Sequence, residues 1–296
     1  MGVGTAGGCN CEAAVPSTRR FLECMPTDHV VVKLDFSNAF NCLHRGEMLQ
    51  SVADHVPELY PYCFSAYSNP SVLFYGQYKI LSQEGPQQGD PIGPLLFCNT
   101  IHPLLISLIS ALKLGYMDDV TLGGSQDVAK DVKLVMDAGA ALGLHLNIAK
   151  CEIISHPGCC ITDSLLQSFM QVSVSDASLL GAPLFPGSVL DNAWTLRCEE
   201  LSRAVDRLEA VGSQDALILL RASFSAPRVQ HLLRCSPSVD NAGLETFDRL
   251  LRSAVGRITN SDLSDTQWLQ ASMPIRQGGL GLRRVSSLAF SAFLAS

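Results

Sequence analysis

The sequence predicts an α+β fold, an antiparallel sheet with helices on one face, followed by a mainly helical unit. Up to about residue 155, short runs of β-branched residues alternate with stretches whose apolar residues recur at helical spacing. From Asp191 onward, Arg, Leu and Ala recur at helical spacing and are interrupted by prolines. With 47% hydrophobic residues among 296, the chain can bury real cores and is neither disordered, collagen-like nor a coiled coil.

The first strand and its neighbours follow from local patterns. Residues 12–24 place apolar residues at helical intervals around a proline and predict a short helix. VVVKLDF (30–36) predicts a strand that ends at a carboxylate, and residues 38–56 predict the helix that follows it. Residues 71–81 predict a hairpin with its turn at Gly76–Gln77.

The next elements continue the alternation of helix and strand. A loop rich in Gly, Pro and Gln (84–94) is expected to open a long apolar helix that runs through about Leu112. KLGYMDDVTLGG (113–124) predicts two short strands joined by a tight turn. Residues 127–142 predict a helix, and residues 143–154 predict a return to strand.

Composition restricts the compartment and the partners. The apolar stretch from Pro103 to Leu112 is too short for a membrane span, and no secretory signal begins the chain, so we expect an intracellular protein without a membrane partner. The eleven cysteines lack zinc-type spacing, which favours reduced thiols. The net charge is −7, yet residues 197–296 carry 12 Arg against 10 acids, which suits a contact with phosphates.

Three carboxylates stand out: Asp35 at the end of a hydrophobic strand, and the pair Asp118–Asp119 at the tip of a predicted hairpin. Neighbouring carboxylates between apolar strands repel one another unless a positive charge lies between them. Divalent metal is the natural partner, since Mg²⁺ prefers oxygen ligands. Taken alone, an Asp–Asp dipeptide is also typical of an ordinary surface turn.

Five segments, taken together, resemble a known family in both order and spacing. They match the palm motifs of reverse transcriptases, which are RNA-directed DNA polymerases, and in particular those of non-LTR, LINE-like retrotransposons. The segments are LDFSNAF (34–40), GPQQGDPIGPLLF (85–97), YMDD (116–119), GLHLNIAK (143–150) and LLGAPL (179–184).

This resemblance implies a chemistry and the residues for it. Asp35, Asp118 and Asp119, with the backbone carbonyl of Phe36, would bind two Mg²⁺ ions, which Mn²⁺ could replace. A primer 3′-hydroxyl would attack the α-phosphate of a deoxynucleoside triphosphate on an RNA or DNA template, with loss of pyrophosphate. Lys150 matches a family lysine near the leaving pyrophosphate and would act as general acid.

Three further residues would bind nucleotide and template. Phe40 falls where the family places a bulky side chain that excludes a 2′-hydroxyl, and Gln88 and Gly89 match the loop that contacts the incoming nucleotide and the template. Plainer interpretations stay open: Phe40 as a core residue, the loop as an ordinary helix start, and Lys150 as a solvated surface residue.

The resemblance also implies a division of the chain. Residues 1–29 would be a remnant of the fingers or an entry helix, residues 30–190 the palm, and residues 191–296 a helical thumb-like region. Only about 30 residues precede Asp35, so the chain is expected to be truncated at the fingers and to be a mobile-element fragment. One alternative is an inactive, retroelement-derived nucleic-acid-binding protein. Another is a different palm-type nucleotidyl-transfer enzyme such as a cyclase, against which the GPQQGDP loop argues.

Overall fold

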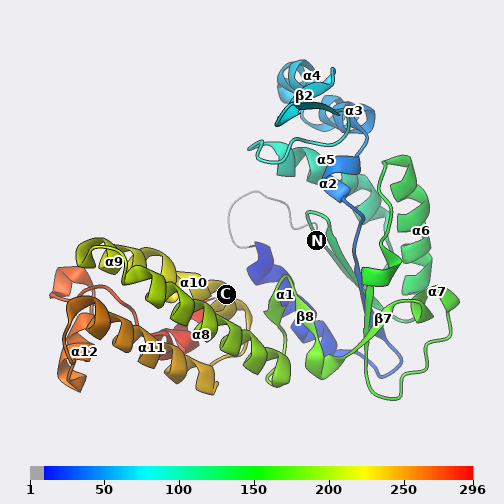
Figure 1. Ribbon diagram of the computed structural model, residues 1–296. Helices are drawn as coiled ribbons and strands as arrows, with labels where there is room; N and C mark the ends of the chain where they lie inside the picture. The colour runs from blue at the N-terminus through cyan, green and yellow to red at the C-terminus, as the bar shows by residue number, and fades with distance from the viewer. Residues whose placement is uncertain (1–9, 296) are drawn as a thin grey trace. The chain divides into compact units, whose positions relative to one another are not determined.

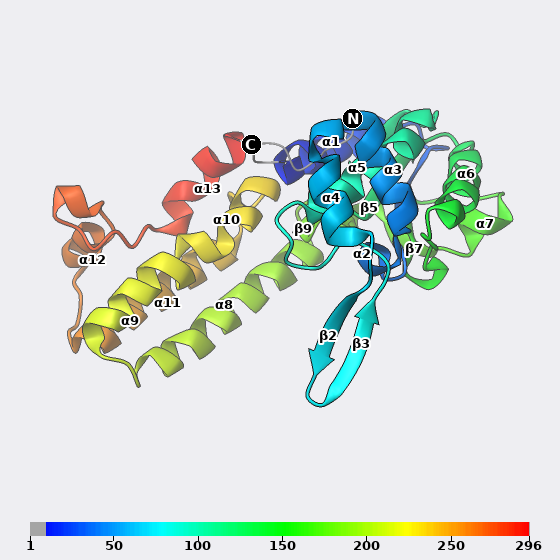
Figure 2. The same cartoon turned by 90° about the horizontal axis from the view of Figure 1, so that it is seen from above.

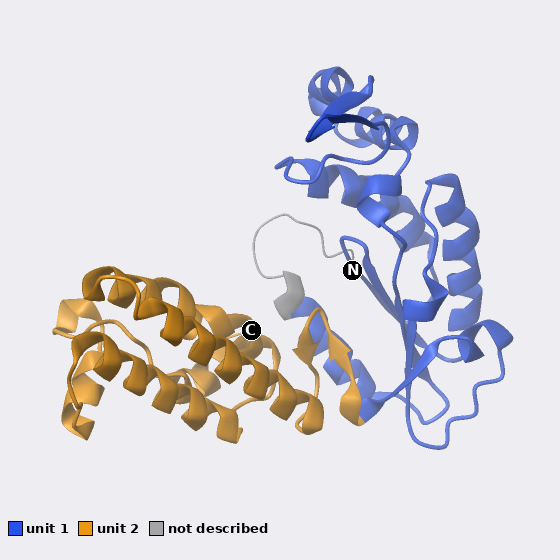
Figure 3. Ribbon diagram, in the orientation of Figure 1, with its two compact units in different colours: residues 1–174 blue, residues 175–296 orange. Residues whose placement is uncertain are grey.

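The computed structural model describes residues 10–295, and the chain divides into two compact units, residues 1–174 and 175–296 (Figure 3). Each unit has its own hydrophobic core. The first unit combines a sheet with helices, and the second is almost entirely helical (Figure 1). The predicted α+β class and the helical texture of the second part are confirmed.

The first unit is organised around a five-stranded sheet with the order β4-β5-β1-β6-β7. Neighbouring strands are antiparallel except for β6 and β7, which pair in parallel. The strands are β1 (Val30–Leu34), β4 (Leu112–Tyr116), β5 (Asp119–Gly124), β6 (Glu152–Ser155) and β7 (Met170–Ser173). The hairpin predicted at residues 113–124 is therefore confirmed as β4–β5.

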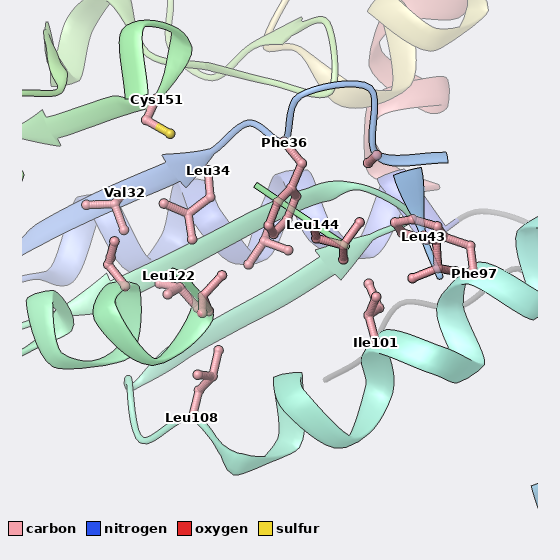
Figure 4. Packing of buried hydrophobic residues seen from close by; sticks show 14 of the residues in the cluster. Val32, Leu34, Phe36, Leu43, Phe97, Ile101, Leu108, Leu122, Leu144 and Cys151 are labelled. Carbon is pink, nitrogen blue, oxygen red and sulfur yellow. The ribbon is translucent and has the colours of Figure 1, made fainter. Parts of the chain in front are cut away.

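Strand β1 lies at the centre of the sheet because its β-branched side chains are buried on both faces. Val30, Val32 and Leu34 belong to the main core of this unit, where they pack with residues of α5 (Gly93–Ser107) and α6 (Val128–Ala141). Figure 4 shows Leu34 and Val32 among the side chains of this core. Burying a branched aliphatic side chain stabilises the fold by roughly 1.5–3 kcal/mol each.

Helix α1 (Asn10–Cys24) lies against the opposite face of the sheet, next to β4 (Figure 1). A Cβ on Gly123 of β5 would lie 2.8 Å from Cε1 of Phe21, so a larger residue here would have to displace the Phe21 ring. The helical layer expected on one face is present, and α1 adds a cover on the second face that the sequence did not indicate.

The prediction of a single helix over residues 38–56 is wrong in the middle of that segment. The structure has two helices, α2 (Ala39–Cys42) and α3 (Arg45–His55), with an extended Leu43 between them. The amide of Gly85 donates to the carbonyl of Leu43 at 2.7 Å, and the amide of His44 donates to the carbonyl of Leu142 at 2.9 Å. Because these backbone groups bond to distant loops, they are withdrawn from the helical ladder.

The apolar helix predicted to run through about Leu112 ends earlier, at Ser107. The amides of Ile109 and Ser110 donate to the buried carboxylate of Asp131, at 3.0 and 2.7 Å. These two amides thus bond to a side chain distant in sequence, and this competes with the hydrogen bonds of a further helical turn. The chain then turns directly into β4.

The remaining elements of the first unit are short. The hairpin predicted at residues 71–81 is confirmed as β2 and β3, which extend away from the rest of the unit (Figure 2). Residues 143–154, predicted as a strand, form strand only from Glu152, because a 3-10 turn precedes it. The bounds are η1 (Pro57–Leu59), α4 (Tyr60–Tyr67), β2 (Ser71–Tyr75), β3 (Tyr78–Ser82), η2 (Ile148–Lys150) and α7 (Ser164–Gln167).

The second unit packs its helices around Trp194 and Phe247, whose rings meet edge to face at 6.2 Å. Trp194 also donates its indole N–H to Ser238 Oγ at 3.0 Å, which satisfies its one polar group. The elements are η3 (Val174–Asp176), β8 (Ser178–Leu179), β9 (Ala182–Pro183), α8 (Ser188–Leu208), α9 (Ser213–Leu219), the π-helix η4 (Leu220–Phe224), α10 (Ala226–Cys235), α11 (Ala242–Thr259), α12 (Asp265–Ala271), η5 (Ile275–Gln277) and α13 (Val285–Leu294).

The sequence composition also led to expectations about membrane spans and about the cysteines. Over residues 10–295, no helix combines the length and the apolar character that crossing a bilayer requires. The nine cysteines whose side chains are described are free thiols; Cys9 and Cys11 lie outside that set.

Candidate active site

Asp35 and Asp119 lie opposite each other at the end of two paired strands. Leu34, the last residue of β1, pairs with Val120 of β5. In this antiparallel register the next residue of β1 is Asp35, and it faces Asp119, the first residue of β5. The sheet therefore brings together two carboxylates that are far apart in sequence.

Asp118 occupies the tight turn beside them. Tyr116 pairs with Asp119, which leaves Met117 and Asp118 as the two residues of the turn. Met117 has φ 55°, a left-handed conformation that costs energy for a side chain of this size. The turn thereby places Asp118 directly beside the Asp35–Asp119 pair.

The carboxylates influence one another electrostatically. Although Asp119 is an exposed residue, desolvation of its carboxyl group raises its pKa, and the charge of Asp118 raises it further. Lys33 lowers the pKa of Asp119 and Asp35 raises it. Lys33 is held by Glu152, with Nζ 2.7 Å from Oε2, so it only partly offsets the acids. The cluster thus carries an excess of negative charge.

The backbone of Asp35 is fixed from the neighbouring segment. The amide of Asn147 donates to the Asp35 carbonyl at 2.7 Å, and the Asp35 amide donates to Sγ of Cys151 at 3.5 Å. Burial raises the pKa of the Cys151 thiol, and the charge of Asp35 adds to that shift. Cys151 (Figure 4) is therefore a neutral, buried thiol, and it contacts the backbone of Asp35.

The donor set suits a hard divalent cation. Among residues 10–295, no three His, Cys, Asp or Glu side chains are gathered closely enough to enclose a metal ion. Mg²⁺ does not require such a cage, since it binds through one or two carboxylates and completes its shell with water and substrate phosphates. The oxygen ligands of Asp35, Asp118 and Asp119, with their mutual repulsion, fit this mode of binding.

The two phenylalanines singled out by the sequence differ in their surroundings. The ring of Phe36 is buried in the core (Figure 4), and its backbone bridges to Leu146. Phe40 is half-buried on α2 and stacks on Phe97 of α5, with ring centroids 4.9 Å apart and planes 8° apart. The Phe40 ring is thus held in one orientation at the edge of the core.

Gln88 and Gly89 lie in an exposed part of the loop that leads into α5, and Gly89 has φ +95°. The base of this loop is held by Arg45, whose side chain is buried. Its Nε donates to the carbonyl of Gly85 at 3.0 Å, and its guanidinium carbon lies 5.2 Å from the centre of the Tyr67 ring. Arg45 also donates to the β3 end of the hairpin.

Tyr67 fixes the loop from its other side. Its hydroxyl donates to Oδ2 of Asp90 and accepts from the amide of Gln87 at 3.2 Å. Oδ1 of Asp90 accepts from the amide of Ile92 at 3.0 Å, at the start of α5. Burial, and then the hydrogen bond to Asp90, raises the pKa of Tyr67 to about 12, so the hydroxyl remains a donor.

Sequence reasoning missed these loop-anchoring residues, Arg45, Tyr67 and Asp90. Arg45 and Tyr67 lie on helices with nothing in their local pattern to mark a role. Asp90 was within the matched GPQQGDP segment, and that was the only available signal.

Lys150 ends the 3-10 turn that precedes β6, three residues after Asn147. It is exposed, and its side chain makes no ion pair with the carboxylates within the described part of the chain. The structure therefore brings the three acids together, while Lys150, Gln88 and Gly89 lie on exposed segments.

Comparisons with known proteins agree with this arrangement. A sequence profile described as "Reverse transcriptase (RNA-dependent DNA polymerase)" matches residues 6–184. The retrotransposable element SLACS 132 kDa protein of Trypanosoma brucei gambiense is 24% identical over 298 aligned residues, covering 95% of this chain and 24% of that protein.

Two solved structures are also similar. Apo telomerase from Candida tropicalis matches with a TM-score of 0.39 and 13% identity over 83% of this chain and 50% of that one. Telomerase from the same organism with a fragment of telomeric RNA matches with a TM-score of 0.40 and 15% identity over 98% and 53%. The chain thus spans about a quarter of the SLACS protein and about half of each telomerase chain.

The profile match extends over more than half of the chain and includes Asp35, Asp118, Asp119 and the Gln88–Gly89 loop. The similarity to a retrotransposon protein agrees with the LINE-like character of the same motifs. The chain belongs to the reverse transcriptase family of RNA-dependent DNA polymerases.

Proposed function

We propose that this chain carries the polymerase site of a non-LTR retrotransposon reverse transcriptase. It adds deoxynucleotides to a primer 3′-hydroxyl on an RNA or DNA template. The observation that carries the proposal is the register that sets Asp35 opposite Asp119, with Asp118 in the adjoining turn. Family membership supports the reaction, and the excess of negative charge at the cluster supports the need for cations.

The site residues have distinct tasks in this proposal. Asp35, Asp118 and Asp119, with the carbonyl of Phe36, hold two Mg²⁺ ions, for which Mn²⁺ can substitute. When bound, these ions supply charge neutralisation at the attacking and leaving oxygens. The Asn147 amide and the Cys151 thiol keep Asp35 in place at the end of β1. Positioning of this kind accounts for most of the catalysis in a phosphoryl transfer.

The remaining residues act on the substrates. Phe40, held by its stacking on Phe97, limits the space at the sugar and selects deoxynucleotides. Gln88 and Gly89 contact the incoming nucleotide and the template from a loop whose base Arg45 fixes. The exposed Lys150 protonates the departing pyrophosphate.

Residues 30–190 are proposed as the palm, residues 191–296 as a thumb-like region and residues 1–29 as an entry segment. The hairpin β8–β9 corresponds to the matched LLGAPL segment. Its turn residues Leu180 and Gly181 both have positive φ, as the tightest two-residue hairpins require.

The test is deoxynucleotide incorporation on a primed RNA template with Mg²⁺. Purified chain is compared with the Asp118→Asn/Asp119→Asn variant and with Asp137→Asn. Asp137 is an exposed residue of α6 and serves as the matched control for removal of an acid. We expect extension by the wild type and by Asp137→Asn, and its loss in the double variant.

Template–primer binding is measured in parallel on the same three proteins. Extension that survives in the double variant would overturn the assignment of the site. Binding of the template–primer without extension by the wild type would instead indicate a catalytically inactive nucleic-acid-binding relic.

A further inference from the structure

The second unit contains a pocket of about 590 Å³ that the proposed polymerase site does not use. Helix α10, the π-helix η4, helix α13 and the segment before α13 form its walls. The packing of α10 against α13 can be followed in Figures 1 and 2. A concave site of this volume falls within the range that binds small molecules in proteins.

Three arginines line this pocket, Arg221, Arg234 and Arg283, and no Asp or Glu is among its described lining residues. Arg221 and Arg283 form no ion pair within residues 10–295. Two guanidinium groups without acidic partners, those of Arg221 and Arg283, in the wall of one cavity create a field that favours an anion.

A second cavity of the same unit, of about 530 Å³, provides the contrast. It is also lined by arginines, but Arg252 pairs with Asp265 at 2.6 Å and Arg257 pairs with Asp206 at 2.9 Å. These two charges are already neutralised within the protein, whereas Arg249, the third arginine of this cavity, donates to Thr246 Oγ1 at 3.0 Å. The two cavities thus have the same number of arginines and differ in how many of them are paired with acids.

The start of α10 adds to the positive field. Ser225 is the N-cap residue, yet its hydroxyl donates to the carbonyl of Arg221 at 2.9 Å instead of capping the helix. Ser225, Ala226 and Pro227 all line the pocket. The ten-residue helix therefore begins at this wall with its positive dipole end and without a side-chain cap.

The rest of the lining is largely apolar and includes Leu233, Leu288 and Ala292, with Gln230 as a polar group. Apolar side chains suit the face of a nucleobase, an amide can read its edge, and arginine can pair with a phosphate. We propose that this pocket binds the phosphate and base of a nucleotide at a site separate from the polymerase carboxylates. The ligand is either a free nucleoside monophosphate or one nucleotide of a strand.

The test is binding of fluorescently labelled deoxyadenosine monophosphate to the full chain, followed by anisotropy in EDTA so that no divalent ion takes part. The Arg221→Gln/Arg283→Gln variant removes the arginines that form no ion pair. Each lost charge-assisted hydrogen bond weakens binding by about tenfold. Arg252→Gln/Arg257→Gln removes the same charge from the second cavity and is expected to change the Kd by less than about twofold.

Arg283→Gln alone serves as the second variant, because Arg283 is exposed and its loss leaves the fold intact. The proposal is overturned if both double variants bind the labelled nucleotide equally weakly. It is also overturned if neither Arg221→Gln/Arg283→Gln nor Arg283→Gln weakens this binding. Displacement by unphosphorylated deoxyadenosine as effective as that by deoxyadenosine monophosphate also overturns it.

Competition distinguishes the two sources of the nucleotide. A 5′-phosphorylated trinucleotide that displaces the probe at lower concentration than deoxyadenosine monophosphate identifies a strand as the ligand, and equal displacement identifies a free nucleotide. The Asp118→Asn/Asp119→Asn variant retains this binding, since the pocket does not include the carboxylates. The binding test therefore gives its answer even if the chain fails to incorporate deoxynucleotides.

Discussion

A Cβ at Gly85 would lie 1.9 Å from the carbonyl oxygen of Phe40, far inside van der Waals contact. Gly85 also has φ +67°, which strains any other residue. The loop that carries Gln88 and Gly89 is therefore pressed against the end of α2, close to the residue proposed to select the sugar.

The substitution Gly85→Ala is expected to lower the free energy of unfolding by about 3 kcal/mol or more, because strain and overpacking add. Urea denaturation measures it. Gly46→Ala is the matched control, since Gly46 is helical and nothing lies within 4 Å of the place that an added Cβ would take. Equal stability of the two variants would show that the loop can shift to accommodate a side chain at Gly85.

The hydroxyl of Tyr67 links Asp90 to the amide of Gln87. Tyr67→Phe removes both bonds and keeps the packed ring. We expect KM for deoxynucleotides to rise about tenfold with little change in kcat, because the loop loses its position and the carboxylates are untouched. Tyr78→Phe, which removes an exposed hydroxyl, is the control.

Hydrogen exchange of residues 84–92 gives a second measurement for Tyr67→Phe that does not depend on activity. Faster exchange there is expected, with unchanged exchange in β1. Protection of the loop equal to wild type would contradict the anchoring role of Tyr67.

Asp119 makes stability depend on pH. Its folded pKa lies above 3.8, so the ionised carboxylate destabilises the folded state. This destabilisation is complete above the folded pKa and disappears as the pH falls below 3.8. In EDTA, Asp119→Asn is expected to raise Tm at pH 7, with the difference from wild type vanishing in acid.

Asp127→Asn supplies the control of opposite sign, because the hydrogen bond from Lys130 lowers the pKa of Asp127. Its Tm at pH 7 is expected to be unchanged or lower. A lower Tm for Asp119→Asn at pH 7 would mean that the fold stabilises the ionised carboxylate, which contradicts a raised pKa for Asp119.

Phe40 can serve in sugar selection, in core packing, or in both, and substitutions can distinguish these roles. Phe40→Val is expected to raise ribonucleotide incorporation relative to deoxynucleotide by at least about tenfold, and to cost about 1–3 kcal/mol of stability through lost stacking. Phe97→Leu removes the stacking partner and keeps Phe40. If both variants lose stability and neither changes sugar selection, Phe40 is only a core residue.

Asp248 is a buried acid that caps the start of α13. It accepts from the amide of Val285 at 2.7 Å and from the hydroxyl of Ser286 at 2.6 Å. Asp248→Ala leaves these donors without their acceptor and is expected to cost about 2 kcal/mol or more in urea denaturation. Asp262→Ala, at an exposed position, is expected to have little effect; equal losses would argue against the cap.

The sequence by itself determined the strand that ends before Asp35 and both predicted hairpins, and it singled out the three carboxylates. These features depend on local information: β-branched runs, the turn residues at Gly76 and at Met117–Asp118, and motifs of a known family. That Asp35 lies opposite Asp119 depends on the pairing of β1 with β5, which the folded sheet supplies.

Tertiary structure alone decided the break at Leu43, the early end of α5 and the anchoring of the loop by Arg45 and Tyr67. In each case a backbone or side-chain group bonds to a partner distant in sequence, such as Leu43 to Gly85 or Ile109 to Asp131. Local propensity carries no record of such partners, because a buried polar group takes whichever partner the packed chain brings to it.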